Sequence, residues 1–321
     1  MSVPGTPASH DARVTLQRIL VPLDGSRLAE SVLPAAFSLA QHLHARLTLL
    51  HVMERAAPMT VHGERHLTGA SEAEAYLTEV ASQRPVQVHI DHHVHPNKEG
   101  DVAKSIIDHA ADLGADLVTL STHGRGGARR VLFGSVAQLV LHGGTRPVLL
   151  IRPDAIAPHP VAPWEVGRIL VPLDGSAPSE DALPISVAVG AAYGAEVHLV
   201  RIVPTLGTIP GERASAARLA PTAAVASLEI EQEDARKALE AVATRIRGSG
   251  TRALAVVGRG DPAQGVLEEA LRVRADLVVM ATHGRTGLDA VLSGSVASRI
   301  AAKFPRPLLL VRSPRASPEQ S

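Results

Sequence analysis

The sequence predicts an α/β protein of two tandem domains, each with a five-stranded parallel sheet and helices on both faces. Three observations support this fold class. The chain repeats itself, each copy alternates short apolar runs with segments of helical periodicity, and the apolar runs are nearly continuous Val, Ile and Leu, as in strands buried on both faces. A length of 321 residues is enough for two such domains.

The repeat is visible in four blocks. The stretch RILVPLDGS at Arg18 to Ser26 recurs unchanged at Arg168 to Ser176, an offset of 150 residues. The later blocks recur at an offset of 160, so the second copy carries about ten extra residues. These blocks are Ala115 to Arg125 with Ala275 to Arg285, Gly134 to Ala137 with Gly294 to Ala297, and Arg146 to Arg152 with Arg306 to Arg312. A repeat this long is a domain rather than a solenoid unit.

Each copy opens with a buried strand, Ile19 to Val21 or Ile169 to Val171, which ends at Pro, Asp and Gly. A helix should follow, with Ser26 or Ser176 as its N-cap. Pro34 and Pro184 lie inside this helical pattern and are expected to kink it.

The remaining elements are expected in the same order in both copies. First come a second strand (47–52, 197–203) and a variable, partly helical section that holds the extra length (63–82, 214–247). A third strand (86–94, 253–257), a helix after Gly-Asp (102–113, 263–273) and a fourth strand (116–120, 276–280) follow. Each copy then has a glycine-bearing loop, a helix that begins near Gly134 or Gly294, and a last strand (148–151, 308–311).

Composition excludes several classes of protein. A net charge of zero argues against binding to nucleic acid or to an acidic membrane, and 2% aromatic residues are too few for base-stacking platforms. The absence of cysteine excludes disulfides and thiolate sites and fits a cytoplasmic location. No apolar window is long enough to span a membrane.

We expect a disordered tail at 1–15, domains at 16–152 and 166–312, a stiff proline-rich linker at 153–165 and a tail at 313–321. The two domains should pack side by side as an internal pseudo-dimer.

Two repeated motifs follow strands whose carboxyl ends face the crevice where such sheets bind ligands. Asp24 or Asp174 follows the first strand, where it could accept hydrogen bonds from ribose hydroxyls. The glycine loop after the fourth strand leads into a helix N-terminus, which favours phosphate. Alternatively, the glycines only permit tight turns, Ser135 and Ser295 cap a helix, and the aspartates cap the preceding turn. Joint occurrence in both copies favours a nucleotide pocket.

These motifs resemble the universal stress protein family over residues 16–152 and 166–312. The family's nucleotide-binding members carry Gly-x-x-Gly, nine residues, then Gly-Ser or Gly-Thr after the fourth strand. The positions that match are Gly124, Gly134 and Ser135 in the first copy and Gly284, Gly294 and Ser295 in the second. Ser121 and Ala281 stand where the family has its first glycine, so a small side chain replaces bare backbone at that point.

The resemblance implies flavodoxin-like (adenine nucleotide alpha hydrolase-like) domains with strand order 3-2-1-4-5, in which the last strand mediates dimer pairing. It also implies the residues around adenine and ribose. These are Pro22, Asp24, Val52, Leu120 and Val136 in the first site, and Pro172, Asp174, Ile202, Met280 and Val296 in the second.

Phosphate contacts should come from backbone amides, Ser135, Ser295 and the loop arginines Arg125 and Arg285, because the chain has no phosphate-loop lysine motif. Arg129 and Arg130 make the first loop more basic than the second, where Asp289 is the counterpart of Arg129. The first site should therefore hold a triphosphate more strongly, unless these arginines only form a solvated helix face.

Histidines suggest two further sites. His123 and His283 recur in the loops, where a hydrogen bond to backbone is the expected role. Strand periodicity places His89, Asp91, His93 and His95 on one face, which could bind Zn, Ni or Cu. A wet edge strand explains the same residues, and the second copy has no counterpart, so we expect no metal site.

We therefore expect a stress-response protein that binds ATP, or AMP or ADP, and acts as a sensor or regulator of a protein partner. Asp24 could hold Mg²⁺ on the nucleotide, and hydrolysis should at most be slow. One alternative is an interaction scaffold with degenerate pockets. Another is a small hydrolase or nucleotidyl-transferring enzyme on the same fold. A homodimer of the whole chain also stays open.

Overall fold

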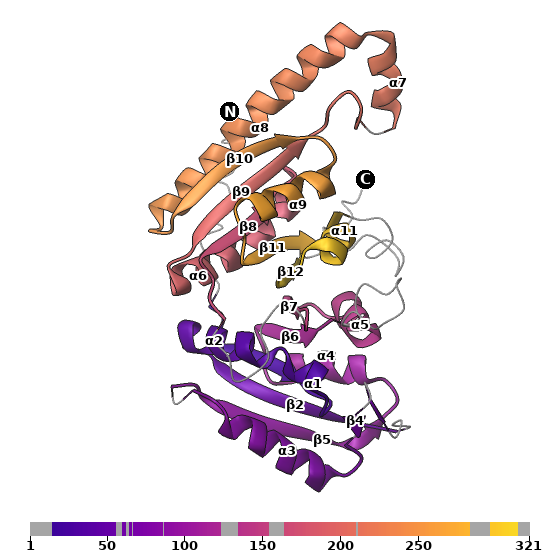
Figure 1. Cartoon of the computed structure of the whole chain (residues 1–321), viewed down its shortest axis with the longest axis vertical. Helices are drawn as coiled ribbons and strands as arrows, with labels where there is room; N and C mark the ends of the chain where they lie inside the picture. Colours follow the sequence, from indigo (N-terminus) through magenta and orange to yellow (C-terminus); the bar gives the residue numbers. More distant parts are fainter. Residues whose placement is uncertain are drawn as a thin grey trace, which may run out of the picture.

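The computed structural model describes residues 15–55, 60–61, 64–65, 67–85, 87–122, 134–153, 164–209, 211–282 and 296–313. Within these ranges both repeats contribute to one ten-stranded sheet (Figure 1). The first repeat contains β1 (Arg18–Pro22), α1 (Arg27–Glu30), α2 (Leu33–Leu43), β2 (Arg46–Glu54), β3 (Thr60–Val61), β4 (Glu64–Arg65), α3 (Ala70–Ser82), β5 (Ile90–Glu99), α4 (Val102–Asp112), β6 (Leu117–Ser121), α5 (Ser135–Gly143) and β7 (Val148–Ile151).

The second repeat has the same order of sheet strands. It contains β8 (Arg168–Pro172), a 3₁₀ segment (Ala177–Ala182), α6 (Leu183–Tyr193), β9 (Glu196–Val203), α7 (Glu212–Leu219), α8 (Pro221–Gly248), β10 (Ala253–Arg259), α9 (Pro262–Arg272), β11 (Leu277–Thr282), α11 (Val296–Lys303) and β12 (Leu308–Arg312). The extra length of this copy lies in the section that forms α7 and α8, and Figure 1 shows α8 extending beyond the sheet toward α7.

The strand order confirms the expected fold class. The sheet runs β10-β9-β8-β11-β12-β7-β6-β1-β2-β5, so each half has the order 3-2-1-4-5. Neighbouring strands within each half are parallel. Alternate residues of a strand enter different cores: Ile19 and Val21 pack on the face covered by α2 and α3, and Leu20 packs on the face covered by α4 and α5.

The last strands of the two repeats join the halves, as expected for an internal pseudo-dimer. β7 and β12 pair antiparallel with Leu149 opposite Leu309, and both side chains are fully buried. Arg312 donates to the carbonyl oxygen of His142 at 2.7 Å, at the end of α5. Arg152 donates in return to the carbonyl oxygen of Ala302 at 3.3 Å, in the last turn of α11. The repeated final arginine therefore binds the carboxyl end of a helix in the other repeat, where carbonyl groups favour a cation.

A second junction lies between α2 and α6. The Ser38 hydroxyl donates to the carbonyl oxygen of Trp164 and lies 2.8 Å from the Tyr193 hydroxyl. His42 stacks on the Tyr193 ring with centroids 4.0 Å apart. Burial raises the pKa of Tyr193 above its ordinary value.

Two expectations from the sequence were wrong in detail. Pro34 and Pro184 do not kink a helix; each lies in the first turn of α2 or α6, where a missing N–H leaves no helical hydrogen bond unmade. The third strand of the first repeat begins at Ile90 rather than 86, because the Val88 amide donates to the carbonyl oxygen of Pro85 in a turn. Val88 is still 97% buried. Its apolar side chain therefore indicated a buried position, but not a strand.

Candidate functional site

The turn after β1 holds Asp24 in a fixed position. Its Oδ1 accepts hydrogen bonds from the Ser26 amide (2.9 Å) and the Ser26 hydroxyl (2.6 Å). The Ser26 oxygen also accepts from the Ala29 amide at 3.1 Å, so it caps α1 as expected. Asp24 thus caps its own turn, while no described residue donates to its Oδ2.

The second repeat builds the same turn. Oδ1 of Asp174 accepts from the Ser176 amide (2.8 Å) and hydroxyl (2.6 Å). Unlike Ser26, Ser176 does not cap the following segment with its side chain. The two aspartates occupy equivalent positions at the carboxyl ends of β1 and β8.

Different side chains cover the two turns. Gly25 (φ +89°) and Gly175 (φ +87°) have backbone conformations that glycine favours. A Cβ on Gly25 would lie 2.8 Å from Cγ of Leu67, and one on Gly175 would lie 2.5 Å from Nη1 of Arg201. The sequence did not indicate either contact, because Leu67 and Arg201 belong to other elements.

The fourth strands end beside these turns, since β6 pairs with β1 and β11 pairs with β8 in parallel. Ser121 is the last residue of β6, and Ala281 lies within β11. Neither has a positive φ, so no conformational strain results from replacing glycine at these positions. Relative to glycine, Ser121 adds the volume of a hydroxymethyl group and Ala281 adds that of a methyl group.

The helix after the fourth strand begins where expected. α5 starts at Ser135 with Gly134 as N-cap, and a glycine has no side chain that could cap the first amides. Ser135 therefore does not cap the helix as an N-cap residue would. α11 is described from Val296 onward.

The apolar residues expected around the adenosine all belong to one hydrophobic cluster that extends over both repeats. Val52, Leu120 and Met280 are buried members of it, and Val136, Ile202 and Val296 are partly buried and pack against it. Val52 and Leu120 are each only 7% exposed and Met280 is 6% exposed. Pro22 and Pro172 end β1 and β8 and are partly buried. These walls are therefore packed largely against the protein itself.

Several expected site residues lie outside the described residues. These are Gly124, Gly284, Gly294 and Ser295, the loop histidines His123 and His283, and Arg125, Arg129, Arg130, Arg285 and Asp289.

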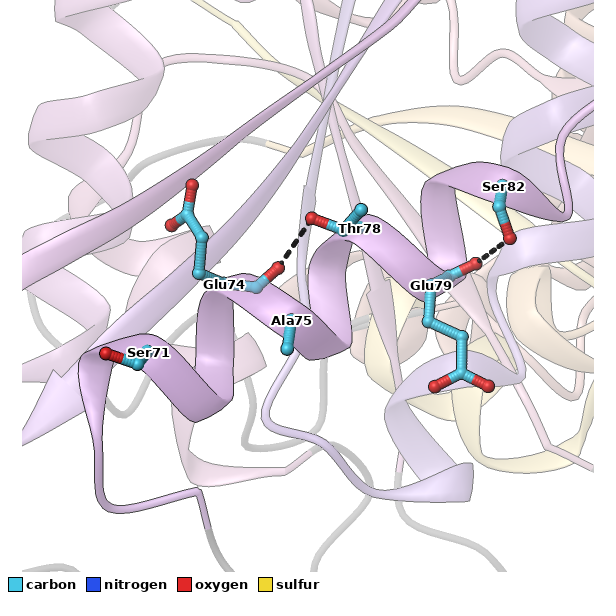
Figure 2. A pocket seen from close by; sticks show the side chains of 6 residues that line it. All are labelled: Ser71, Glu74, Ala75, Thr78, Glu79 and Ser82. Atoms are coloured by element: carbon cyan, nitrogen blue, oxygen red, sulfur yellow. Dashed lines mark hydrogen bonds between the residues drawn. The ribbon is translucent and has the colours of Figure 1, made fainter.

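A surface depression of about 690 Å³ lies elsewhere, along α3 (Figure 2). It is lined by Ser71, Glu74, Ala75, Thr78, Glu79 and Ser82. Two of its hydroxyls donate to carbonyl oxygens of α3 itself: Thr78 to Glu74 (2.8 Å) and Ser82 to Glu79 (2.6 Å). All lining residues come from one helix, so the depression lacks the converging polar groups of a ligand site.

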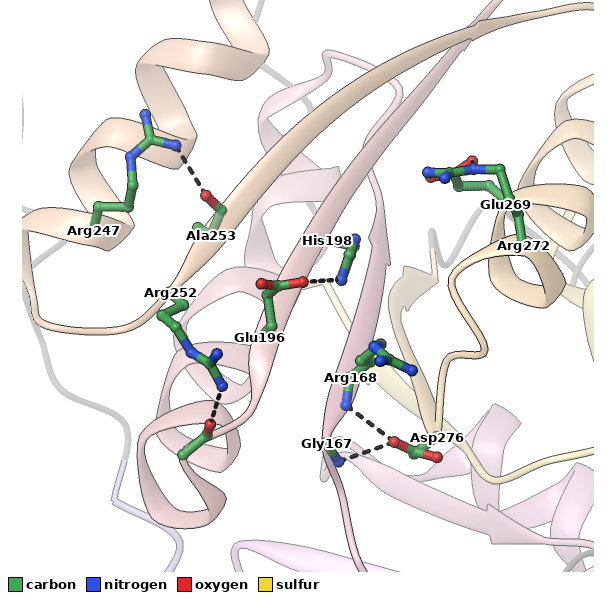
Figure 3. Close-up of polar contacts among 11 residues, drawn as sticks. Gly167, Arg168, Glu196, His198, Arg247, Arg252, Ala253, Glu269, Arg272 and Asp276 are labelled. Carbon is green, nitrogen blue, oxygen red and sulfur yellow. Dashed lines mark hydrogen bonds and ion pairs between the residues drawn. The ribbon is translucent and has the colours of Figure 1, made fainter.

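The repeated aspartate of the second block, Asp116 or Asp276, has a structural role. Oδ2 of Asp276 accepts from the amides of Gly167 (2.9 Å) and Arg168 (3.0 Å), as Figure 3 shows. Oδ2 of Asp116 accepts from Gln17 and Arg18 in the same way. Each aspartate fixes the start of the first strand of its own repeat. This end of the strands is opposite to the end that carries the turns of Asp24 and Asp174.

The histidine-rich strand is β5, at the edge of the sheet, as expected. Nε2 of His89 lies 3.2 Å from Oδ1 of Asp91. His93 and His95 instead meet His109 of α4, and one ring nitrogen of each lies within 4.8 Å of the others. Sequence periodicity missed His109 because it lies on the following helix.

No helix in the described ranges has the length and apolar composition needed to span a bilayer.

Comparison with known proteins supports the fold and its duplication. The model of the universal stress protein family matches residues 15–152 and 165–312. A universal stress protein of Mycolicibacterium smegmatis is 29% identical over 308 residues, which cover 94% of this chain and 88% of that protein. One from Methanocaldococcus jannaschii is 31% identical over 151 residues, which cover 46% of this chain and 83% of that protein.

Among solved structures, the crystal structure of a universal stress protein from Archaeoglobus fulgidus has a TM-score of 0.66 at 18% identity. The match covers 94% of this chain and 99% of that one, so the shared fold extends over both repeats. The family model matches most of the sequence in two consecutive segments. The chain therefore belongs to the universal stress protein family, with two of the family's domains in tandem.

Proposed function

We propose that this chain binds ATP, or a related adenine nucleotide, at the carboxyl ends of β1 and β6 and of β8 and β11, and acts as a sensor or regulator with at most slow hydrolysis. The observation that carries the proposal is the duplicated carboxylate turn. In both repeats Oδ1 of the aspartate is held by the same two donors at nearly equal distances. The turn lies beside the end of the fourth strand, at the crevice where sheets of this order bind ligands.

The surrounding groups suit an adenosine phosphate. In the first repeat Asp24 would accept from ribose hydroxyls or hold Mg²⁺, and Val52, Leu120 and Val136 would contact adenine. The N-terminus of α5, where the N-cap residue Gly134 offers no capping side chain, would favour phosphate. In the second repeat Asp174 and the Ile202, Met280 and Val296 cluster would take the same roles. Slow hydrolysis is the upper limit proposed because the described residues around either turn include no paired nucleophile and base.

A second candidate is an interaction scaffold with degenerate pockets. It is favoured by Leu67 and Arg201, which cover the glycine turns, and by the small exposed fractions of Val52, Leu120 and Met280. Under this alternative the protein's own side chains occupy the space of the adenosine.

Isothermal titration with ATP and with AMP, each with and without Mg²⁺, separates the two candidates. Asp24→Asn keeps an oxygen that can accept from Ser26 but removes the charge. Loss of a charged acceptor costs about 1.5–3 kcal/mol, so affinity at the first site should fall about tenfold or more. Asp174→Asn should do the same at the second site.

Glu233→Gln is the matched control, because it removes one charge from the exposed surface of α8, away from both turns. It should bind nucleotide as the parent chain does. Absence of heat with every nucleotide would favour the scaffold. Rapid phosphate release would instead indicate an enzyme.

A further inference from the structure

The histidine cluster on β5 and α4 is the group of side chains that the nucleotide proposal does not use. His93 and His95 lie two residues apart on one face of β5, and their strand partners Leu50 and Val52 belong to the core under α4. His109 comes from α4, which covers that face. Its ring centroid lies 5.1 Å from that of His93 and 4.9 Å from that of His95.

Three imidazoles this close form a donor set of the kind that binds Zn²⁺ and neighbouring first-row cations. Their ligand nitrogens lie within 4.8 Å of one another. In a tetrahedral zinc site they would lie roughly 3.3 Å apart, because each Zn–N bond is about 2.0–2.1 Å. Small side-chain rotations would close this difference, and a fourth position would remain for water.

Hydrogen bonds already orient two of the three rings. Nδ1 of His109 lies 2.8 Å from the carbonyl oxygen of Ser105. A carbonyl oxygen can only accept, so Nδ1 carries the proton and Nε2 keeps its lone pair. Nε2 of His95 likewise lies 3.0 Å from Oε1 of Glu99, which leaves Nδ1 as the lone-pair nitrogen. Histidines that bind metals usually donate their other nitrogen to a carbonyl or carboxylate in this way.

The surroundings of His93 favour the neutral form of its ring. Burial, then the neighbouring His109 and His95, lower the pKa of His93. Neutral imidazole is the form that coordinates a metal.

The second repeat shows that the fold does not require these histidines. Strand register places Val256 at the position of His93, opposite Val200, and Gly258 at the position of His95, opposite Ile202. Glu269 replaces His109 and pairs with Arg272 through two hydrogen bonds of 2.6 and 2.8 Å (Figure 3). The cluster therefore belongs to the first repeat and has no structural counterpart among the described residues of the second.

We propose that His93, His95 and His109 form a binding site for one divalent first-row transition metal, Zn²⁺ in particular, and that Glu99 orients His95 as a positioning residue. This site is separate from the proposed nucleotide turns and does not depend on them. It reverses the expectation from the sequence that the histidine-rich strand binds no metal.

The test is titration of the full chain, free of any polyhistidine tag, with Zn²⁺ by calorimetry. The parent should bind one Zn²⁺. This binding should be lost in His109→Gln and in the triple variant His93→Gln, His95→Gln, His109→Gln. Glu99→Gln should bind about 10–100-fold more weakly, the usual effect of removing a partner of a ligating histidine. The thermal transition in EDTA checks that each variant is folded.

His92→Gln is the matched control. His92 directly precedes the proposed ligand His93 on the same strand, but its Nε2 lies 3.2 Å from Oε1 of Glu74 on α3, on the other face. It should keep parental affinity. The proposal would be overturned if His92→Gln lost as much Zn²⁺ affinity as His109→Gln, or if the triple variant bound Zn²⁺ as the parent does.

Co²⁺ binding by the parent gives a second measurement that needs no variant. A site of three imidazoles and water should give the intense visible absorption of four-coordinate Co²⁺. A spectrum that stays that of the hexaaquo ion would also overturn the proposal.

Discussion

Aspartate has three separate roles in each repeat of this chain, although the sequence singled out only one of them. Asp24 and Asp174 hold the turns of the proposed nucleotide site. Asp116 and Asp276 bind two backbone amides at the start of the first strand. Asp101 and Asp261 cap α4 and α9. The repeated aspartate of the second block, Asp116 or Asp276, therefore aligns the first strand and does not belong to the proposed ligand site.

Asp116→Ala should lower the free energy of unfolding by about 2 kcal/mol. It leaves the amides of Gln17 and Arg18 without their charged acceptor, and hydrogen bonds to charged groups contribute about 1.5–3 kcal/mol. Urea denaturation measures the change. Asp112→Ala, an exposed residue at the end of α4, is the control and should stay within about 0.5 kcal/mol. An equal loss in both variants would contradict this role for Asp116.

The helices and strands could largely be predicted from the sequence because the repeat supplied each pattern twice. The errors occurred where one pattern fits two structures. A proline inside a helical pattern can kink a helix or start a new one, and Pro34 and Pro184 do the latter. Individual side-chain contacts between segments far apart in the sequence were not predictable. Leu67, Arg201 and His109 reach their partners only after the chain has folded.

The caps of α4 and α9 differ in one contact that gives a testable difference between the repeats. Asp261 binds Arg299 through two hydrogen bonds of 2.8 and 2.9 Å, and Leu139 occupies the position of Arg299 in the first repeat. Asp101→Ala should cost about 1 kcal/mol of stability, as is usual for an N-cap. Asp261→Ala should cost more, because it also leaves Arg299 without this partner. Urea denaturation at neutral pH compares the two, and equal losses would show that the arginine contributes nothing.

The same contact predicts a dependence on pH. Arg299, then the Gln264 amide, lowers the pKa of Asp261. The contribution of this contact is therefore complete above the ordinary aspartate pKa of about 3.9 and is lost as the pH falls through the lower folded value. The stability difference between parent and Asp261→Ala should shrink in that acidic window. A constant difference down to the lowest pH at which the protein folds would contradict it.

The two repeats form one continuous structure, since β7 and β12 join their strands into a single sheet. Arg152 and Arg312 also each bind a helix end of the other repeat. Trp164, the only tryptophan, lies 8% exposed at the second junction. Its fluorescence therefore reports on the contact between α2 and α6. The sequence predicted this pseudo-dimer from the duplication and the short linker, but it did not indicate the cluster of Ser38, Trp164 and Tyr193.

Ser38→Ala should lower the free energy of unfolding by about 1–3 kcal/mol, because it leaves the Trp164 carbonyl and the Tyr193 hydroxyl without a buried partner. Tyr193→Phe should cost less stability, since it keeps the ring stack with His42 and the hydrogen bond from Ser38 to the Trp164 carbonyl oxygen. Unfolding followed by Trp164 fluorescence compares them. A larger loss in Tyr193→Phe would contradict this order.

Native mass spectrometry of the chain, purified and then incubated with Mg²⁺ and ATP, examines most directly whether both repeats bind an adenine nucleotide. We expect masses that correspond to one and to two bound nucleotides, and the second to need about tenfold or more ATP in Asp24→Asn or Asp174→Asn. Only the mass of the bare chain at every ATP concentration, with the parent still folded, would contradict nucleotide binding and favour the scaffold.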